Sequence, residues 1–201
     1  MRKRSLLLAS ILIGVSTIAP AAAARTWGVS AGPSKLFDDH VNLGFRCAGT
    51  CFEDLRPHFA FGVEAAFDRW SPSGTPNVIG VDWHASGVTY VLEITPELRV
   101  TTAKSDRDPE QLFAEIGAGA GFVSSNAEVE VSVPGYPGSG QRGYDLDSQV
   151  APLLSLGIGG RFLSGGAFGE VDLKLHVLFT NASTEPASST NYLSLSFGVA
   201  F

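Results

Sequence analysis

Strict alternation of apolar residues with small or polar ones is the feature that most constrains the fold of this chain. It is clearest in residues 192–201, where Leu, Phe and Val side chains occupy one parity and Tyr, Ser, Gly and Ala occupy the other. Residues 170–180 repeat the pattern, with aliphatic and aromatic side chains on one face and ionisable ones on the other. Successive side chains of a β-strand point to opposite faces of a sheet. Both segments therefore predict amphipathic strands.

The same alternation recurs along the chain between stretches rich in Gly, Pro, Ser, Asn and Asp, which favour turns and loops. The predicted strands are residues 26–34, 41–47, 58–69, 87–101, 111–123, 149–163, 167–181 and 191–201. The connections at 35–40, 70–86, 124–148 and 182–190, which are expected on the exterior side, alternate with those at 48–57, 102–110 and 164–166. The largest, 124–148, contains a Pro- and Gly-rich run and is expected to be an exposed, irregular loop.

No segment after the N-terminal region is both long and uniformly apolar, so only a closed barrel could span a membrane. Long loops on one side and short turns on the other are typical of outer-membrane barrels. The sequence therefore predicts an all-β fold, an eight-stranded antiparallel up-and-down transmembrane β-barrel with both termini on the periplasmic side.

The N-terminus has the features of a secretory signal peptide. Basic residues precede an apolar run from Leu6 to Ile18, which is short of the roughly 20 residues of a membrane-spanning helix. Small residues follow, and Ala22 and Ala24 suit cleavage before Arg25. We expect a signal peptide over residues 1–24, a barrel domain over residues 25–201, and the bacterial outer membrane as the destination.

Cleavage would leave 11 basic and 20 acidic residues, a net charge of −9. This acidity argues against nucleic acid as a partner, because phosphate binding needs a clustered basic surface. Cys47 and Cys51 are the only cysteines, and an exported protein could join them in a disulfide. Residues four apart in one strand lie about 13 Å from each other, so the bond would require a turn. No metal site, cofactor or catalytic residue is predicted.

The aliphatic faces are expected to meet lipid, and the faces that combine Gly, Ala and Ser with charges are expected to line the lumen. An eight-stranded barrel has an interior just wide enough for side chains, which also suits the run Gly117-Ala-Gly-Ala-Gly121. The ionisable residues expected in the lumen are Arg46, Glu64, Asp68, Glu93, Glu97, Arg99, Glu115, Arg161, Glu170, Asp172, Lys174 and His176.

Three segments resemble outer-membrane β-barrel proteins of the small eight-stranded, porin-like or opacity type. They are residues 27–32, residues 113–121 and the C-terminal segment 192–201. The resemblance implies that the barrel-assembly machinery reads the last strand, and that outer-membrane lipid and lipopolysaccharide surround the barrel. This predicted assembly signal comprises Tyr192, Leu193, Leu195, Phe197, Val199 and Phe201.

The leading functional hypothesis is a non-enzymatic outer-membrane protein with a structural or surface-interaction role carried by loops 70–86 and 124–148. One alternative is a narrow channel with a charged lumen. Another is a lipid A-modifying enzyme, although residue 178 is not the Ser that the lipid A deacylase family places two residues after its His, here His176. A last alternative is a soluble periplasmic barrel that binds an apolar ligand, which requires the two faces to be exchanged.

Overall fold

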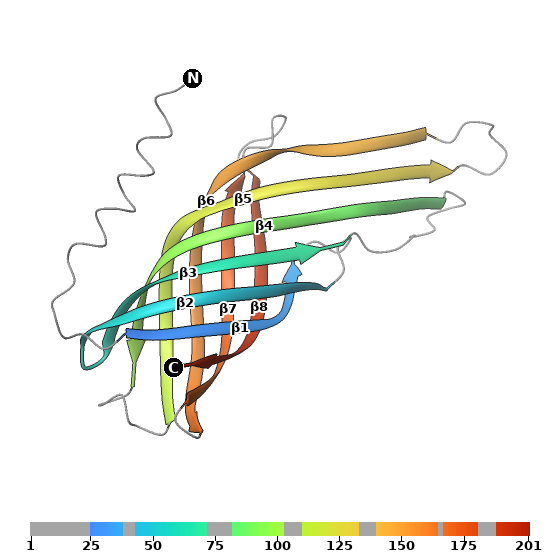
Figure 1. Cartoon of the computed structure of the whole chain (residues 1–201). Helices are drawn as coiled ribbons and strands as arrows, with labels where there is room; N and C mark the ends of the chain where they lie inside the picture. Colours follow the sequence, from blue (N-terminus) through green and yellow to red (C-terminus); the bar gives the residue numbers. More distant parts are fainter. Residues whose placement is uncertain are drawn as a thin grey trace, which may run out of the picture.

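The computed structural model describes residues 25–37, 43–71, 82–102, 110–132, 140–164, 167–180 and 188–201. These residues form a closed antiparallel barrel in which each strand pairs with its neighbours in the sequence and β1 pairs with β8 (Figure 1). The strands are β1 (Arg25–Leu36), β2 (Gly44–Arg56), β3 (Phe59–Trp70), β4 (Asp82–Thr101), β5 (Glu110–Ser132), β6 (Gly140–Ser164), β7 (Ala167–Thr180) and β8 (Ser188–Ala200). The predicted fold class is confirmed. The predicted signal peptide lies outside the described residues.

The first and last strands close the barrel. Gly28 pairs with Ala200 and Leu36 pairs with Tyr192, and Trp27 and Phe201 exchange two backbone hydrogen bonds of 2.9 and 2.8 Å. The two ends of the barrel domain therefore lie at the same end of the barrel. We call this the terminal end and the opposite one the distal end.

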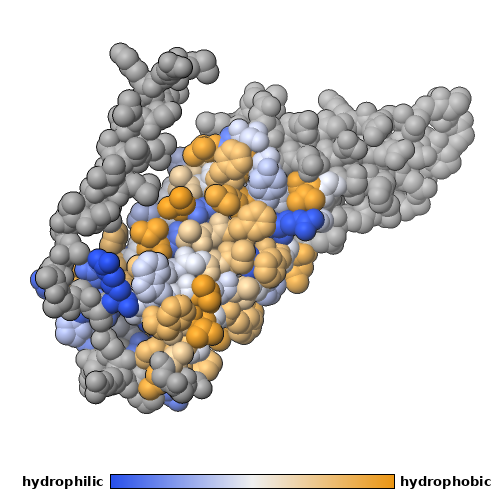
Figure 2. Space-filling view, in the orientation of Figure 1, coloured by the Kyte–Doolittle hydropathy of each residue, from blue (hydrophilic) through white to orange (hydrophobic). Residues whose placement is uncertain are grey.

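Apolar side chains cover the outside of the barrel. Figure 2 shows an apolar band across the face in view, between hydrophilic patches toward its ends. On β5 the outward residues run from Leu112 to Phe122, both exposed. They cover about 33 Å of strand, and at a tilt near 40° this corresponds to a height of about 25 Å, the thickness of the apolar band of outer-membrane barrels.

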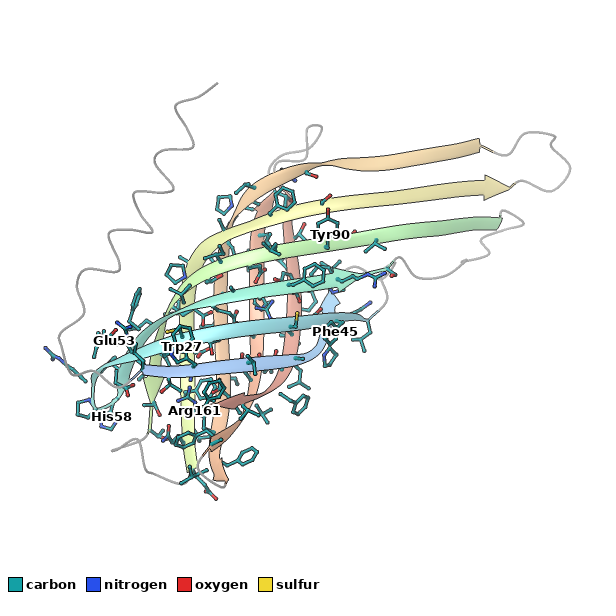
Figure 3. The ribbon with its side chains drawn as sticks, in the orientation of Figure 1. Trp27, Phe45, Glu53, His58, Tyr90 and Arg161 are labelled. Atoms are coloured by element: carbon teal, nitrogen blue, oxygen red, sulfur yellow. The ribbon has the colours of Figure 1, made fainter. Side chains whose placement is uncertain are left out.

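Exposed aromatic residues mark both edges of this band, as in the girdles of membrane barrels. Figure 3 shows Trp27 toward the terminal end and Phe45 and Tyr90 toward the distal end. Further exposed aromatic residues are Phe59, Phe162 and Phe201 at the terminal end and Phe37, Phe122 and Phe179 at the distal end. The apolar faces point outward, so the soluble barrel with an apolar interior is ruled out.

Strands β4, β5 and β6 continue past the distal rim as a three-stranded sheet (Figure 1). The pairing of β4 with β3 begins only at Thr89, and that of β6 with β7 begins only at Leu153. Between β5 and β6 the register shifts between Val123 and Ser125, at the point where the sheet leaves the barrel. A bulge of this kind bends a strand and is common at barrel rims. We call residues 82–88, 125–132 and 140–152 the distal extension.

The distal extension corrects two predicted loops. Residues 82–86 and much of 124–148 are strand, whereas the sequence predicts loops over 70–86 and 124–148. The Pro- and Gly-rich run that motivates the longer loop falls largely at 133–139, outside the described residues. Turn-forming residues there do not prevent pairing on either side, because the backbone ladder needs only two strands in register.

Strand β2 is also longer than predicted, and the expected turn at 48–57 reduces to Pro57–His58. Its outward residues include Cys47, Gly49 and Cys51, whose small side chains hide the alternation in the sequence. Both cysteines are free thiols on the outer face of one strand. At about 13 Å along the strand they exceed the roughly 7 Å limit between Cα atoms for a disulfide. The predicted possible bond between Cys47 and Cys51 is therefore not compatible with this fold.

None of the described residues forms a helix that is long and apolar enough to cross a membrane.

Candidate functional site

The ionisable residues expected in the lumen all lie on the inner face of the barrel, on strands β2 to β7. Most are almost inaccessible to solvent, and Arg161, Glu170 and Asp172 are the more accessible ones, with side chains 12%, 15% and 13% exposed. Buried charges must be paired, because removing them from water is costly. The structure brings these residues together in three clusters stacked along the barrel axis.

Lys174 on β7 forms the central cluster. Its ammonium nitrogen lies 3.0 Å from Glu64, 2.9 Å from Glu97 and 3.1 Å from Glu115. Asp172 is 3.8 Å away. Ser155 adds a hydrogen bond of 3.2 Å to Glu97. A single cation thus holds carboxylates from β3, β4, β5 and β7 across the lumen.

Arg46 on β2 forms the cluster toward the distal end. Its guanidinium donates to Glu64 at 2.6 Å, to Glu93 at 3.3 Å and to Asp68. The hydroxyl of Tyr192 donates to Glu93 and, at 3.3 Å, to Asp68. Glu64 also contacts Lys174, so this cluster and the central one share a carboxylate.

Arg99 and Arg161 form the cluster at the terminal end. Arg99 donates to Glu115 and, at 2.9 Å, to Glu170. Arg161 donates through Nε to the other oxygen of Glu170 at 2.7 Å. The guanidinium of Arg99 is sandwiched between the rings of Phe52 and Phe113, at 4.0 and 4.2 Å. Aromatic faces stabilise a cation held in this way.

His176 lies inside the lumen and is fully buried. Its Nε2 is 3.1 Å from the Ser194 hydroxyl, and its Nδ1 is 3.4 Å from Glu93 but forms no hydrogen bond. Ser, His and Glu in this order resemble a nucleophile, a base and an orienting acid. Ser194 is only 1% exposed, however, and the ring of His176 is stacked on Tyr192 at 4.4 Å. The arrangement leaves the hydroxyl without access to a substrate.

An apolar layer covers the ion pairs on the distal side. Its largest members are Trp70 and Tyr192, whose rings meet edge to face at 4.9 Å. The layer consists of Leu36, Trp70, Val91, Val123, Ala151, Leu153, Leu178 and Tyr192. Together with the ion pairs, it occupies the middle and distal parts of the lumen over the part of the chain that the structure describes, whereas a cavity remains at the terminal end.

The sequence does not indicate the apolar layer or the polar partners Ser155 and Ser194. The predicted assembly signal includes Tyr192, yet its side chain is inside the barrel, whereas Phe197, Val199 and Phe201 are exposed on the outside. Its position agrees with the parity of Tyr192, which it shares with Ser194 and Ser196 on the face that the sequence assigns to the lumen. Among the described residues, no three His, Cys, Asp or Glu side chains are grouped to hold a metal ion.

No protein-family model and no curated protein matches this sequence. Solved structures do match it. A major outer membrane protein from Thermus thermophilus is 14% identical over 89% of this chain and 99% of that chain, with a TM-score of 0.51. The chain has the fold of a small outer-membrane β-barrel.

Two further structures are similar at lower TM-scores. Neisserial surface protein A is 12% identical over 89% of this chain and 97% of its own, with a TM-score of 0.49. The outer membrane protein OprG from Pseudomonas aeruginosa is 9% identical with the same coverage of both chains and the same TM-score.

Proposed function

We propose that this chain is a non-enzymatic integral protein of the bacterial outer membrane whose barrel anchors an interaction surface, the distal extension, at the cell exterior. The packed lumen is the observation that carries this proposal. Paired charges and an apolar layer occupy the space through which solutes would pass. The apolar side chains that a soluble protein would bury instead face outward.

The distal extension supports a role in surface interaction. It continues the β-sheet beyond the apolar band, where pairing with β3 and β7 has ended. Unpaired strand edges present rows of backbone donors and acceptors, to which another extended chain can add as a strand. Outer-membrane lipid and lipopolysaccharide around the barrel, and the barrel-assembly machinery acting on β8, are the other partners that we propose.

A conductance experiment tests the closed lumen. Protein refolded in detergent and added to planar lipid bilayers should give no conductance steps, while a known porin added to the same bilayer should. A steady cation-selective conductance, lost in Glu170→Ala, would replace this proposal with a narrow channel. The excess of carboxylates over cations in the lumen is the observation that favours that second candidate.

Location and exposure are tested in cells. An epitope inserted between Gly138 and Ser139 should bind antibody on intact cells, and the protein should fractionate with the outer membrane and change its gel mobility on heating. Recovery of the protein in the soluble periplasmic fraction would contradict the proposal. A change in the mass spectrum of lipid A on overexpression would instead support the enzyme alternative.

A further inference from the structure

A cavity of about 350 Å³ opens at the terminal end of the barrel, below the cluster of Arg99 and Arg161. The turn at Pro57–His58 and the ends of β1, β4 and β5 form its rim. Figure 3 shows His58 and Arg161 toward this same end. The volume is at the lower end of the range of small-molecule sites in proteins. We call this cavity the vestibule.

Arg161 places a partly accessible cation in the vestibule wall, with its side chain 12% exposed. Its Nε, and not either of its two terminal nitrogens, forms the 2.7 Å contact with Glu170. Glu170 also serves Arg99 through both of its oxygens, at 2.9 and 3.5 Å. This carboxylate is therefore shared between two guanidinium groups.

The charges of the lumen are separated along the axis. Glu115 contacts Lys174 in the middle of the barrel. Most of the remaining carboxylates of the lumen lie farther from the terminal end than Glu115. The vestibule lining contains Arg56, Arg99 and Arg161 against Asp54, while Glu170, which is not part of the lining, is bound to both Arg99 and Arg161. The side chains that line the cavity are therefore more basic than acidic, although the lumen as a whole contains more acidic than basic groups.

Aromatic side chains form the apolar part of the wall. Phe52, Phe113 and Phe168 line the vestibule, together with Leu55 and Ala60. The rings of Phe113 and Phe168 are 6.0 and 5.9 Å from the guanidinium carbon of Arg161. An apolar body could contact these rings while an acidic group reached Arg161.

We propose that the vestibule binds a small organic anion consisting of a planar carboxylate on an aromatic or other apolar body. A carboxylate matches the geometry of a guanidinium, which can donate two parallel hydrogen bonds to its oxygens. The terminal nitrogens of Arg161 supply these donors, and the phenylalanine rings supply the contact with the body. This site is separate from the distal extension, so the two proposals can fail independently.

Isothermal titration calorimetry on the full barrel in detergent micelles tests the site. N-acetylphenylalanine is the probe, and N-acetylphenylalaninamide, which has the same body without the charge, is its control. Hydrogen bonds to a charged group contribute about 1.5–3 kcal/mol. We therefore expect the acid to bind at least about tenfold more tightly than the amide, and Arg161→Gln to reduce the affinity for the acid by a similar factor.

Two further variants separate binding from folding. Ala60→Leu fills the vestibule without changing its charge and should also weaken binding of the acid. This variant tests the site if Arg161→Gln does not fold. Arg25→Gln removes an exposed cation at the same end, paired with Glu53, and should leave the affinity within about twofold. No binding, equal binding of acid and amide, or unchanged affinity in both vestibule variants would overturn the proposal.

Discussion

The ammonium group of Lys174 holds together the carboxylates at the centre of the lumen, and its side chain is only 2% exposed. Replacing it with Met would leave Glu64, Glu97, Glu115 and Asp172 close together without their shared partner. Removing one member of a buried ionic group costs about 3–5 kcal/mol. We expect Lys174→Met to lose stability of this order, measured by urea unfolding of the barrel in lipid vesicles.

A compensating variant identifies the cause. Glu97→Gln removes one of the carboxylate charges, so the double variant with Lys174→Met should be more stable than Lys174→Met alone. Arg25→Gln breaks an exposed pair of 3.4 Å and should cost less than about 1 kcal/mol. Equal losses in Lys174→Met and Arg25→Gln would show that the central ion pairs contribute no more than surface ones.

Gly119 on β5 lies where the neighbouring strand approaches closely. A Cβ atom at this position would overlap the backbone oxygen of Ile94 and lie 2.8 Å from the Cα of Thr95. Backbone atoms cannot move aside as a side chain can, so Gly119→Ala should cost about 1–3 kcal/mol or more. Gly49→Ala is the matched control, because its Cβ would meet only one backbone oxygen, at 4.0 Å. The same unfolding measurement should separate the two, and similar stabilities would contradict the close approach.

At the scale of the element, the sequence predicts a strand well where large side chains alternate with charged ones. The predicted 167–181 and 191–201 differ little from β7 (Ala167–Thr180) and β8 (Ser188–Ala200). Strand β2 is predicted too short because Cys47, Gly49 and Cys51 give its outer face no apolar signal. The distal extension escapes prediction for another reason. Residues 128–131 alternate Glu with Val, but the Pro- and Gly-rich run that follows them leads the sequence to predict a loop over the whole of 124–148.

The residues of the candidate site are also only partly predictable from the sequence. Charged residues such as Arg46 and Glu115 could be assigned to the lumen because their neighbours in the strand are apolar. The apolar layer could not, because Trp70 and Leu178 point inward at positions where parity alone predicts polar residues. Which carboxylate pairs with which cation depends on contacts between distant strands, such as Lys174 with Glu64, and sequence spacing does not contain this information.

The outer face of β2 also determines the state of the two cysteines. Because Cys47 and Cys51 point the same way from one extended strand, we expect both thiols to remain free in protein isolated from an oxidising compartment. Unfolding in N-ethylmaleimide without reductant should add two labels per chain by mass spectrometry. A reduced and relabelled sample provides the control. Labels that appear only after reduction would require β2 to turn between these residues.

At the scale of the whole molecule, the barrel reverses the distribution of a soluble protein, with charges inside and apolar side chains outside. Ion pairs connect strands on opposite sides of the lumen. The stability of the barrel therefore does not depend on an apolar core along its full length. The apolar layer occupies only the distal part, between the Arg46 cluster and the distal extension. The exterior of the barrel is broadly apolar, and the hydrocarbon core of a lipid bilayer is the environment that suits such a surface.

This distribution makes the cost of an exterior charge depend on its depth in the bilayer. Ile116 and Leu112 lie on the same face of β5, 58% and 67% exposed, but Ile116 is nearer the middle of the apolar band. An Arg at the midplane of a membrane barrel costs about 2–4 kcal/mol, and one near the interface costs about 0–1 kcal/mol. Ile116→Arg should therefore destabilise the barrel in vesicles much more than Leu112→Arg does. In a water-soluble barrel both substitutions would be nearly neutral, so equal and small effects would exclude a transmembrane position.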